Sequence, residues 1–207
     1  MVDGGSQEEP PLIKAIRKEN FAIAETILDL DIHRFLNYFD VLCLTDKVGR
    51  NALHLAVIKS QNKLVQRLVF LDADSKKMRG AKDSKGKTPE QYDFSSQFKD
   101  VLVTLWDIVK TGNVERLKQI MMKGGKTAPP PGKYFPDTLT PWLKNSPLHA
   151  AVKAKQLEVV RFLVFDLDAS VELPNKKDFT PMAYCNKYIK DEATYLTMKG
   201  LLEKTSQ

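Results

Sequence analysis

Asn51–Asp74 reads NALHLAVIKSQNKLVQRLVFLDAD, and Ser146–Ser170 reads SPLHAAVKAKQLEVVRFLVFDLDAS. Many residues are identical between the two segments at a constant offset of 95 positions. In the first segment they include Leu53, His54, Ala56, Val57, Val65, Leu68, Val69 and Phe70. A constant offset over so many identities indicates a repeated structural unit, and repeats predict the architecture of a chain more strongly than any local pattern. Stacked repeats form binding surfaces more often than catalytic pockets, so the repeat also favours a binding function.

Within Asn51–Asp74 the apolar residues recur at spacings of three and four on both sides of a polar break at Ser60–Asn62. This spacing predicts two short amphipathic helices joined by a turn. Helices of roughly ten residues or fewer are marginal on their own. We therefore expect each pair to bury its apolar face against a neighbouring pair.

Further copies lie on either side of these two segments. Pro11–Leu28 corresponds to Leu105–Met121 at an offset of 93, and Thr88–Pro89 corresponds to Thr180–Pro181 at an offset of 92. The chain therefore divides into a block of three units that is duplicated, about 10–103 and about 104–204, after a flexible tail at 1–9.

These residues resemble the ankyrin repeat family, whose helix-turn-helix unit begins with a Thr-Pro-Leu-His-like tetrapeptide. The tetrapeptide stands here as Asn51-Ala52-Leu53-His54 and Ser146-Pro147-Leu148-His149, and Asp46–Gly49 and Asp83–Pro89 resemble the turn that leads into the first helix. Segments 46–74 and 145–170 are closest to the pattern. The resemblance implies an all-α solenoid of five to six helix-turn-helix repeats, arranged as the duplicated three-unit block within one domain at 10–204.

Two departures from the family pattern lead to separate expectations. Leu12 lies 41 residues before Leu53, whereas the family repeat is about 33 residues long. The second block carries a Pro-rich insert at 124–143, which is either a contact arm or a long loop held to the body by its aromatic residues. Between the two blocks there is no room for another helix pair, so we expect one helix from about Ser96 to Lys110 that serves both.

The composition favours a cytoplasmic protein, with the nucleus as the second location. No stretch approaches the roughly 18 apolar residues of a membrane span, and the acidic, polar N-terminus does not resemble a signal peptide. The chain holds two cysteines, Cys43 and Cys185, each in an apolar run, and we expect buried thiols in a reducing compartment.

The candidate catalytic and metal-binding residues lack the neighbouring residues that such sites need. His54 and His149 have no Cys, Asp or second His at ligand spacing, and the family resemblance implies that their imidazoles bond to the backbone of the neighbouring turn. Lys123–Thr127 and Lys85–Thr88 lack the first glycine of a phosphate loop. We expect no catalysis, no metal and no cofactor.

The basic residues show where a partner would bind. The run 74–87 contains six lysines and arginines without an interleaved aromatic residue, so we interpret it as a solvated loop. Eighteen positions of the first helices correspond to those that the family leaves variable on its concave surface. Seven of these are Lys or Arg and one is acidic, an excess over the chain-wide 32 in 207. The predicted partner-binding residues are Lys14, Arg17, Lys18, Leu55, Ile58, Lys59, Tyr92, Lys110, Lys153, Tyr184 and Lys187.

We therefore predict a protein–protein interaction module, an adaptor, scaffold or inhibitor subunit, that binds an acidic partner segment along a basic groove. Leu55, Ile58, Tyr92 and Tyr184 are the expected anchors, and the lysines steer association. The partner could belong to a cytoskeletal or other multi-subunit assembly. The alternative is an electrostatic binder of nucleic acid or of an anionic polymer such as a cytoskeletal surface, for which the net charge of +6 is the signal.

Overall fold

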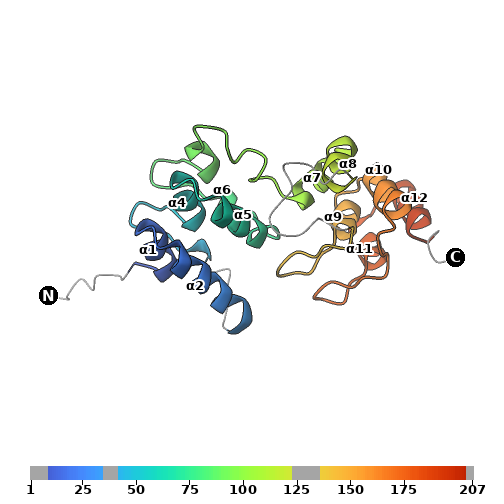
Figure 1. Cartoon of the computed structure of the whole chain (residues 1–207). Coiled ribbons are helices and arrows are strands. Elements are labelled where there is room, and N and C mark those ends of the chain that lie inside the picture. The colour runs from blue at the N-terminus through green and yellow to red at the C-terminus, as the bar shows by residue number, and fades with distance from the viewer. Residues whose placement is uncertain (1–8, 35–41, 123–135, 204–207) are drawn as a thin grey trace. The chain divides into compact units, whose positions relative to one another are not determined.

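A computed structural model describes residues 9–34, 42–122 and 136–203 of the chain (Figure 1). Within these ranges the regular secondary structure is helical apart from one isolated antiparallel bridge between Thr45 and Asn51. This confirms the predicted all-α class. The chain divides into two compact units, Met1–Leu102 (unit 1) and Val103–Gln207 (unit 2), and each is described by itself. None of the described helices is long and apolar enough to span a bilayer.

Unit 1 is built from short helices that pack in chain order (Figure 1). They are α1 (Pro11–Arg17), α2 (Phe21–Arg34), α4 (Ala52–Ile58), α5 (Asn62–Leu71), α6 (Lys77–Gly80) and the 3-10 turn η1 (Pro89–Tyr92). Helix α1 packs on α2, α4 packs on α5, and α4 also contacts both α1 and η1. Because α4 lies between two neighbours, its residues 52–57 are all buried.

Unit 2 has a similar order of helix contacts but ends in a full helix pair. Its elements are α7 (Leu105–Thr111), α8 (Val114–Met122), α9 (Pro147–Lys153), α10 (Leu157–Arg161), the π-helical turn η2 (Phe162–Asp166), α11 (Pro181–Tyr188) and α12 (Glu192–Glu203). The central helix α9 contacts α7 on one side and α11 on the other. Figure 1 shows the loops before α9 and α11 projecting together from the helices of this unit.

Side-chain caps explain where the first helices begin. In each case an oxygen of the residue before the helix accepts a hydrogen bond from a backbone N–H of the first turn, which typically contributes about 1 kcal/mol. The caps are Asn51 for α4, Thr104 for α7, Ser146 for α9 and Thr180 for α11.

In four helix pairs the turn between the two helices has one residue in the left-handed region. Glu19, Ser60, Gly112 and Lys155 occupy this place with φ of 58°, 52°, 76° and 58°. A Cβ at Gly112 would lie 2.4 Å from Oε1 of Gln156, so a side chain there would displace the end of Gln156, whose amide donates to the carbonyl of Lys110 at 2.9 Å.

The expected helix from Ser96 to Lys110 is wrong. Residues 97–102 form turns, with Phe98 buried, and α7 begins only at Leu105. The physical reason is a reciprocal cap. Thr104 has extended backbone with ψ of 162°, its N–H donates to the Asp107 carboxylate at 3.0 Å, and its hydroxyl accepts from the Asp107 N–H at 3.3 Å. This pair starts a new helix and prevents a continuous one.

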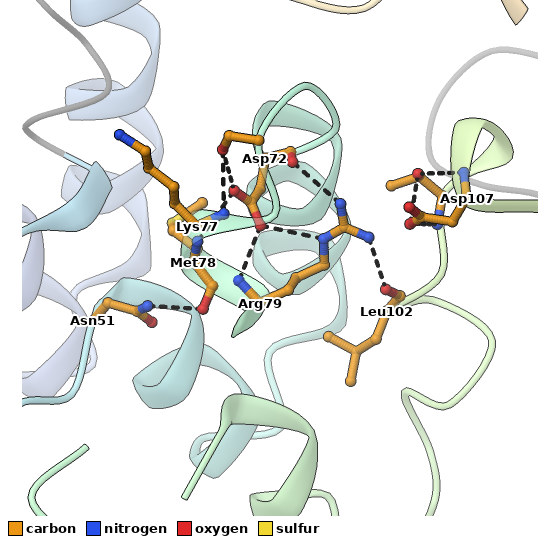
Figure 2. A network of polar contacts seen from close by, with 9 residues as sticks. Asn51, Asp72, Lys77, Met78, Arg79, Leu102 and Asp107 are labelled. Atoms are coloured by element: carbon orange, nitrogen blue, oxygen red, sulfur yellow. Dashed lines mark hydrogen bonds and ion pairs between the residues drawn. The ribbon is translucent and has the colours of Figure 1, made fainter. Parts of the chain in front are cut away.

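The basic run at 74–87 is more ordered than a solvated loop, which corrects that interpretation. Helix α6 lies within it, and Met78 is buried. Figure 2 shows the Asp72 carboxylate accepting from the N–H groups of Met78 and Arg79 and from Nε of Arg79 at 3.1, 2.9 and 3.2 Å. The side chains of Arg79 and Asp72 are 9% and 2% exposed. This buried ion pair ties the end of α5 to α6.

Several other predictions concern the segments between the helices. The Pro-rich insert 124–143 lies outside the described residues up to 135, and so do residues 1–8 of the expected tail. Cys185 is buried as expected, whereas Cys43 is exposed because its neighbour Leu42 takes the buried position. The two thiols are not joined in a disulfide.

Candidate protein-interaction surface

The turns that lead into the first helices share one construction. Oδ1 of Asp46 accepts from the N–H groups two and four residues later, at 3.0 and 2.9 Å. Oδ1 of Asp83 does the same at 2.9 and 2.9 Å, and Oδ1 of Asn175 at 2.8 and 3.2 Å. Thr140 begins a turn that is one residue longer, in which its hydroxyl accepts from the Asn145 N–H at 2.9 Å. An oxygen acceptor at the first position is therefore what the turn needs.

Neighbouring turns within each unit hydrogen-bond to one another. In unit 1 the Ser84 N–H donates to the Val48 carbonyl at 2.9 Å, and in unit 2 the Lys176 N–H donates to the Leu143 carbonyl at 2.9 Å. A Cβ on Gly49 would lie 3.2 Å from the Ser84 nitrogen, so this glycine permits the close approach. The turns and the first helices thereby form one continuous surface in each unit.

The two repeated histidines are structural, which confirms the prediction. Nε2 of His54 contacts the Lys87 carbonyl at 3.0 Å, and Nε2 of His149 contacts the Phe179 carbonyl at 2.8 Å. Nδ1 of each ring is engaged by the capping residue of the same helix. Burial lowers the pKa of both imidazoles, which favours their neutral form. Among the described residues no group of three His, Cys, Asp or Glu side chains could hold a metal ion.

Two of the predicted anchors are core residues, and this corrects the predicted surface. Leu55 is 3% exposed because α4 is covered by both α1 and η1. Tyr184 is 7% exposed, with its ring against His149 at 5.0 Å and its hydroxyl hydrogen-bonded to Asn145 and Asn175 at 3.0 and 3.0 Å. Neither side chain is available to a partner in this structure.

Tyr92 is half-buried, and its hydroxyl donates to Oδ2 of Asp83 at 2.5 Å. This hydrogen bond lowers the pKa of Asp83 and raises the pKa of Tyr92. The remaining predicted residues are exposed or half-buried, and they are Lys14, Arg17, Lys18, Ile58, Lys59, Lys110, Lys153 and Lys187.

Part of the basic surface of unit 1 is neutralised within the unit. Arg17 forms an ion pair with Glu9 at 2.5 Å, and Lys59 forms one with Glu19 at 2.6 Å. Ile58, next to Lys59, is 37% exposed. The surface of unit 1 therefore presents less positive charge to a partner than its lysine and arginine content suggests.

In unit 2 two lysines converge on aromatic rings. Nζ of Lys153 lies 5.1 Å from the ring centroid of Tyr188, and Nζ of Lys187 lies 5.5 Å from the same centroid and 4.5 Å from that of Phe179. Within the described part of the chain, no carboxylate forms an ion pair with either ammonium group. We call these four side chains the lysine–aromatic face.

Comparison with known families assigns the centre of unit 2. Residues 144–176 match the family model described as the ankyrin repeat. This segment is an ankyrin repeat. Its match begins just before the cap of α9 and ends in the turn before α11. A comparison with curated proteins gives no match.

The ankyrin repeat supplies Lys153, at the end of its first helix, and the residues just after it supply Phe179, Lys187 and Tyr188. Ankyrin repeats are typically protein-interaction modules, and this one places its first helix at the lysine–aromatic face. The predicted partner-binding residues include both lysines, whereas Tyr188 is only among the eighteen variable positions and Phe179 was not predicted. Phe179 precedes the Thr180 cap of α11. In the sequence, the one feature that could have pointed to it is its correspondence with Lys87 at the offset of 92.

Proposed function

We propose that the chain is a protein–protein interaction module, an adaptor, scaffold or inhibitor subunit, that binds an acidic partner segment at the lysine–aromatic face of unit 2. The observation that carries the proposal is the pair of lysines at one tyrosine ring without a carboxylate partner. The role requires no cofactor and no catalytic group.

The energetics favour an acidic ligand. Both ammonium groups approach the same ring, so the separation of the two nitrogens cannot exceed the sum of their distances to its centroid. Like charges held near each other repel, and contact with an aromatic face offsets only about 0.5–1 kcal/mol per exposed cation. A carboxylate would reduce the repulsion and could form a charge-assisted hydrogen bond with either lysine.

The aromatic rings supply the second half of the proposed contact. Tyr188 is half-buried and rigid, because its ring packs edge-on against Tyr184 at 5.0 Å between centroids. An ordered aromatic side chain contributes contact area at a low entropic cost. An acidic residue flanked by an apolar one therefore fits this face best. The exposed lysines Lys14, Lys18 and Lys110 would contribute mainly to the association rate.

The test is a selection of phage-displayed random peptides on the full chain. Enrichment in Asp or Glu next to an apolar residue supports the proposal, and recovery of sequences without acidic enrichment overturns it. The selected acidic peptide should lose about tenfold or more in affinity for the Lys153→Glu/Lys187→Glu variant. A matched control, Lys63→Glu/Lys199→Glu, changes the net charge equally on α5 and α12 and should bind as the parent chain does.

Nucleic acid is the competing outcome of the same experiment. A labelled single-stranded DNA oligonucleotide should bind weakly, and its binding should disappear with modest added salt. If the oligonucleotide binds more tightly than the best peptide, with a steep and sequence-independent salt dependence, electrostatic polymer binding replaces the peptide model.

A further inference from the structure

We infer that Asn175 determines the charge preference of the lysine–aromatic face, because its neutral amide leaves the face open to a carboxylate where Asp83, its counterpart in unit 1, places a negative charge. This inference rests on the proposed function of that face and assigns its specificity to one residue outside the contacting set.

Asn175 and Asp83 are equivalent positions. They are related by the offset of 92 that also relates Tyr92 to Tyr184 and Thr88 to Thr180. Both are buried, at 5% and 7% exposure, and Oδ1 of each accepts from the N–H groups two and four residues later. Both also contact the hydroxyl of the following tyrosine, at 3.0 and 2.5 Å.

The turn does not require a charged residue at this position. It uses only Oδ1, which aspartate and asparagine both provide. The other side-chain atom, Oδ2 in Asp83 and Nδ2 in Asn175, differs between the units. Oδ2 of Asp83 accepts from Tyr92, whereas Nδ2 of Asn175 donates to the Tyr184 hydroxyl and to Oδ1 of Asn145, at 3.0 and 2.9 Å. The hydroxyl of Tyr184 donates in turn to Oδ1 of Asn145 at 3.0 Å. The polar chain of unit 2 therefore ends on an amide carbonyl and carries no net charge.

The position of Asn175 connects its charge to the face. Oδ1 of Asn175 accepts from the backbone N–H of Phe179 at 3.2 Å, and the Phe179 ring carries Nζ of Lys187 at 4.5 Å from its centroid. A carboxylate at this position would be linked to Lys187 through Phe179, and charges interact over roughly 10 Å at moderate ionic strength. It would partly neutralise Lys187 and repel an incoming acidic residue.

Asn175→Asp in the full chain tests the inference, with the acidic peptide from the phage selection and its Glu→Gln analogue as probes. The affinity for the acidic peptide should fall about threefold to tenfold at low salt, and the loss should shrink as salt is added. Binding of the Gln analogue should not change. Asn20→Asp is the charge-matched control, because Asn20 caps α2 through the same kind of oxygen, which accepts from the Ile23 N–H at 3.2 Å.

A neutral variant separates charge from structure. Asn175→Thr retains an oxygen acceptor of the type that Thr140 supplies to its own turn, and the affinity for the acidic peptide should stay within about twofold of the parent. Equal losses in the Thr and Asp variants, or no loss in the Asp variant, would overturn the inference. If the Lys153→Glu/Lys187→Glu variant still loses binding in that case, the proposed function stands without it.

Discussion

The two units have a similar order of helix contacts but place their charges differently. In unit 1, Arg67 of α5 forms ion pairs with Glu25 and Asp29 of α2. The positions equivalent to Arg67 and Glu25 in unit 2 are Phe162, which is buried, and Lys118, whose Nζ lies 5.8 Å from the Phe162 ring centroid. The contact between the two helices is thus an ion pair in unit 1 and a cation–π contact in unit 2, where Lys118 also pairs with Glu115 of its own helix at 3.4 Å.

The turns show the same contrast. Arg50 binds Asp46 in unit 1 at 2.8 Å, whereas its equivalent, Asn145, bonds to Thr140 in unit 2. Lysines and arginines therefore make two kinds of contact in this chain, with carboxylates and with aromatic rings. Several basic residues of unit 1 form ion pairs with carboxylates of that unit, and its Lys87 lies over the rings of Tyr92 and Phe94. In unit 2, Lys153 and Lys187 lie over aromatic rings.

The largest predicted effect concerns the buried position that both units share. Leu55 is 3% exposed and its equivalent Ala150 is 8% exposed. Leu55→Asp should destabilise the protein by about 4 kcal/mol or more, because it removes a buried side chain and buries a charge. Urea denaturation followed by circular dichroism measures this.

Ile58→Asp is the control for Leu55, since Ile58 lies one helical turn away and is 37% exposed. It should shift the free energy of unfolding by less than about 1 kcal/mol. Equal unfolding midpoints for Leu55→Asp and the parent chain would show that Leu55 belongs to the surface after all.

The next effect concerns the ion pair that unit 2 lacks. The position equivalent to Asp72 is Leu167. Asp72→Asn should cost about 3 kcal/mol, because breaking a buried ion pair removes the carboxylate that accepts from Nε and N–H of Arg79. Asp168→Asn serves as the control, because Asp168 is exposed and has a φ of 53° that asparagine tolerates. A parent-like melting temperature for Asp72→Asn would mean that this network does not stabilise unit 1.

The smallest effect is a difference in acid sensitivity. Burial lowers the pKa of both histidines, but the negative charges of Asp83 and Asp46 partly raise the pKa of His54 and have no equivalent at His149. A histidine with a folded-state pKa below 6.5 contributes stability that is complete above about pH 6.5 and is lost as the pH falls toward the folded-state value. Protection of amide hydrogens should therefore fall more in α9 than in α4 between about pH 7 and pH 5.

The imidazole resonances provide a second measurement of this difference. A titration followed by NMR should give the lower pKa for His149, and Asn175→Asp should raise it by adding a nearby negative charge. Identical titration of the two histidines would remove the electrostatic contrast between the units.

The sequence predicted the features that depend on local chemistry. The Leu-His tetrapeptides that begin at Asn51 and Ser146 and the turns that begin at Asp46 and Asp83 all have residue types that act over a few positions. The burial of a residue by two neighbouring elements cannot be predicted from such local patterns. Leu55 and Tyr184 correspond to variable surface positions in the family pattern, and only the packing of α4 and the contacts of the Tyr184 hydroxyl show that they are inside.

Other features arise from contacts that residue spacing does not specify. Arg79 belongs to a run of basic residues, and nothing in that run marks it as the partner of Asp72. The predicted helix at 96–110 is interrupted by the Thr104–Asp107 cap, which starts α7 at Leu105. Tyr188 and Phe179 come from different elements and meet only when α11 folds against the preceding turn.

The histidine bond to the next turn has a consequence for how the chain tolerates changes in length. His54 reaches a carbonyl 33 residues later, and His149 reaches one 30 residues later, with nearly the same geometry. The hydrogen bond therefore fixes the distance between the imidazole and the carbonyl, and it does not depend on the number of residues between them. The additional residues of unit 1 lie in the segment between α5 and η1. This segment contains α6, whereas the corresponding segment of unit 2, between η2 and α11, contains no helix. Insertions and deletions should be accommodated in this segment, because the histidine bond holds the first helix and the following turn together.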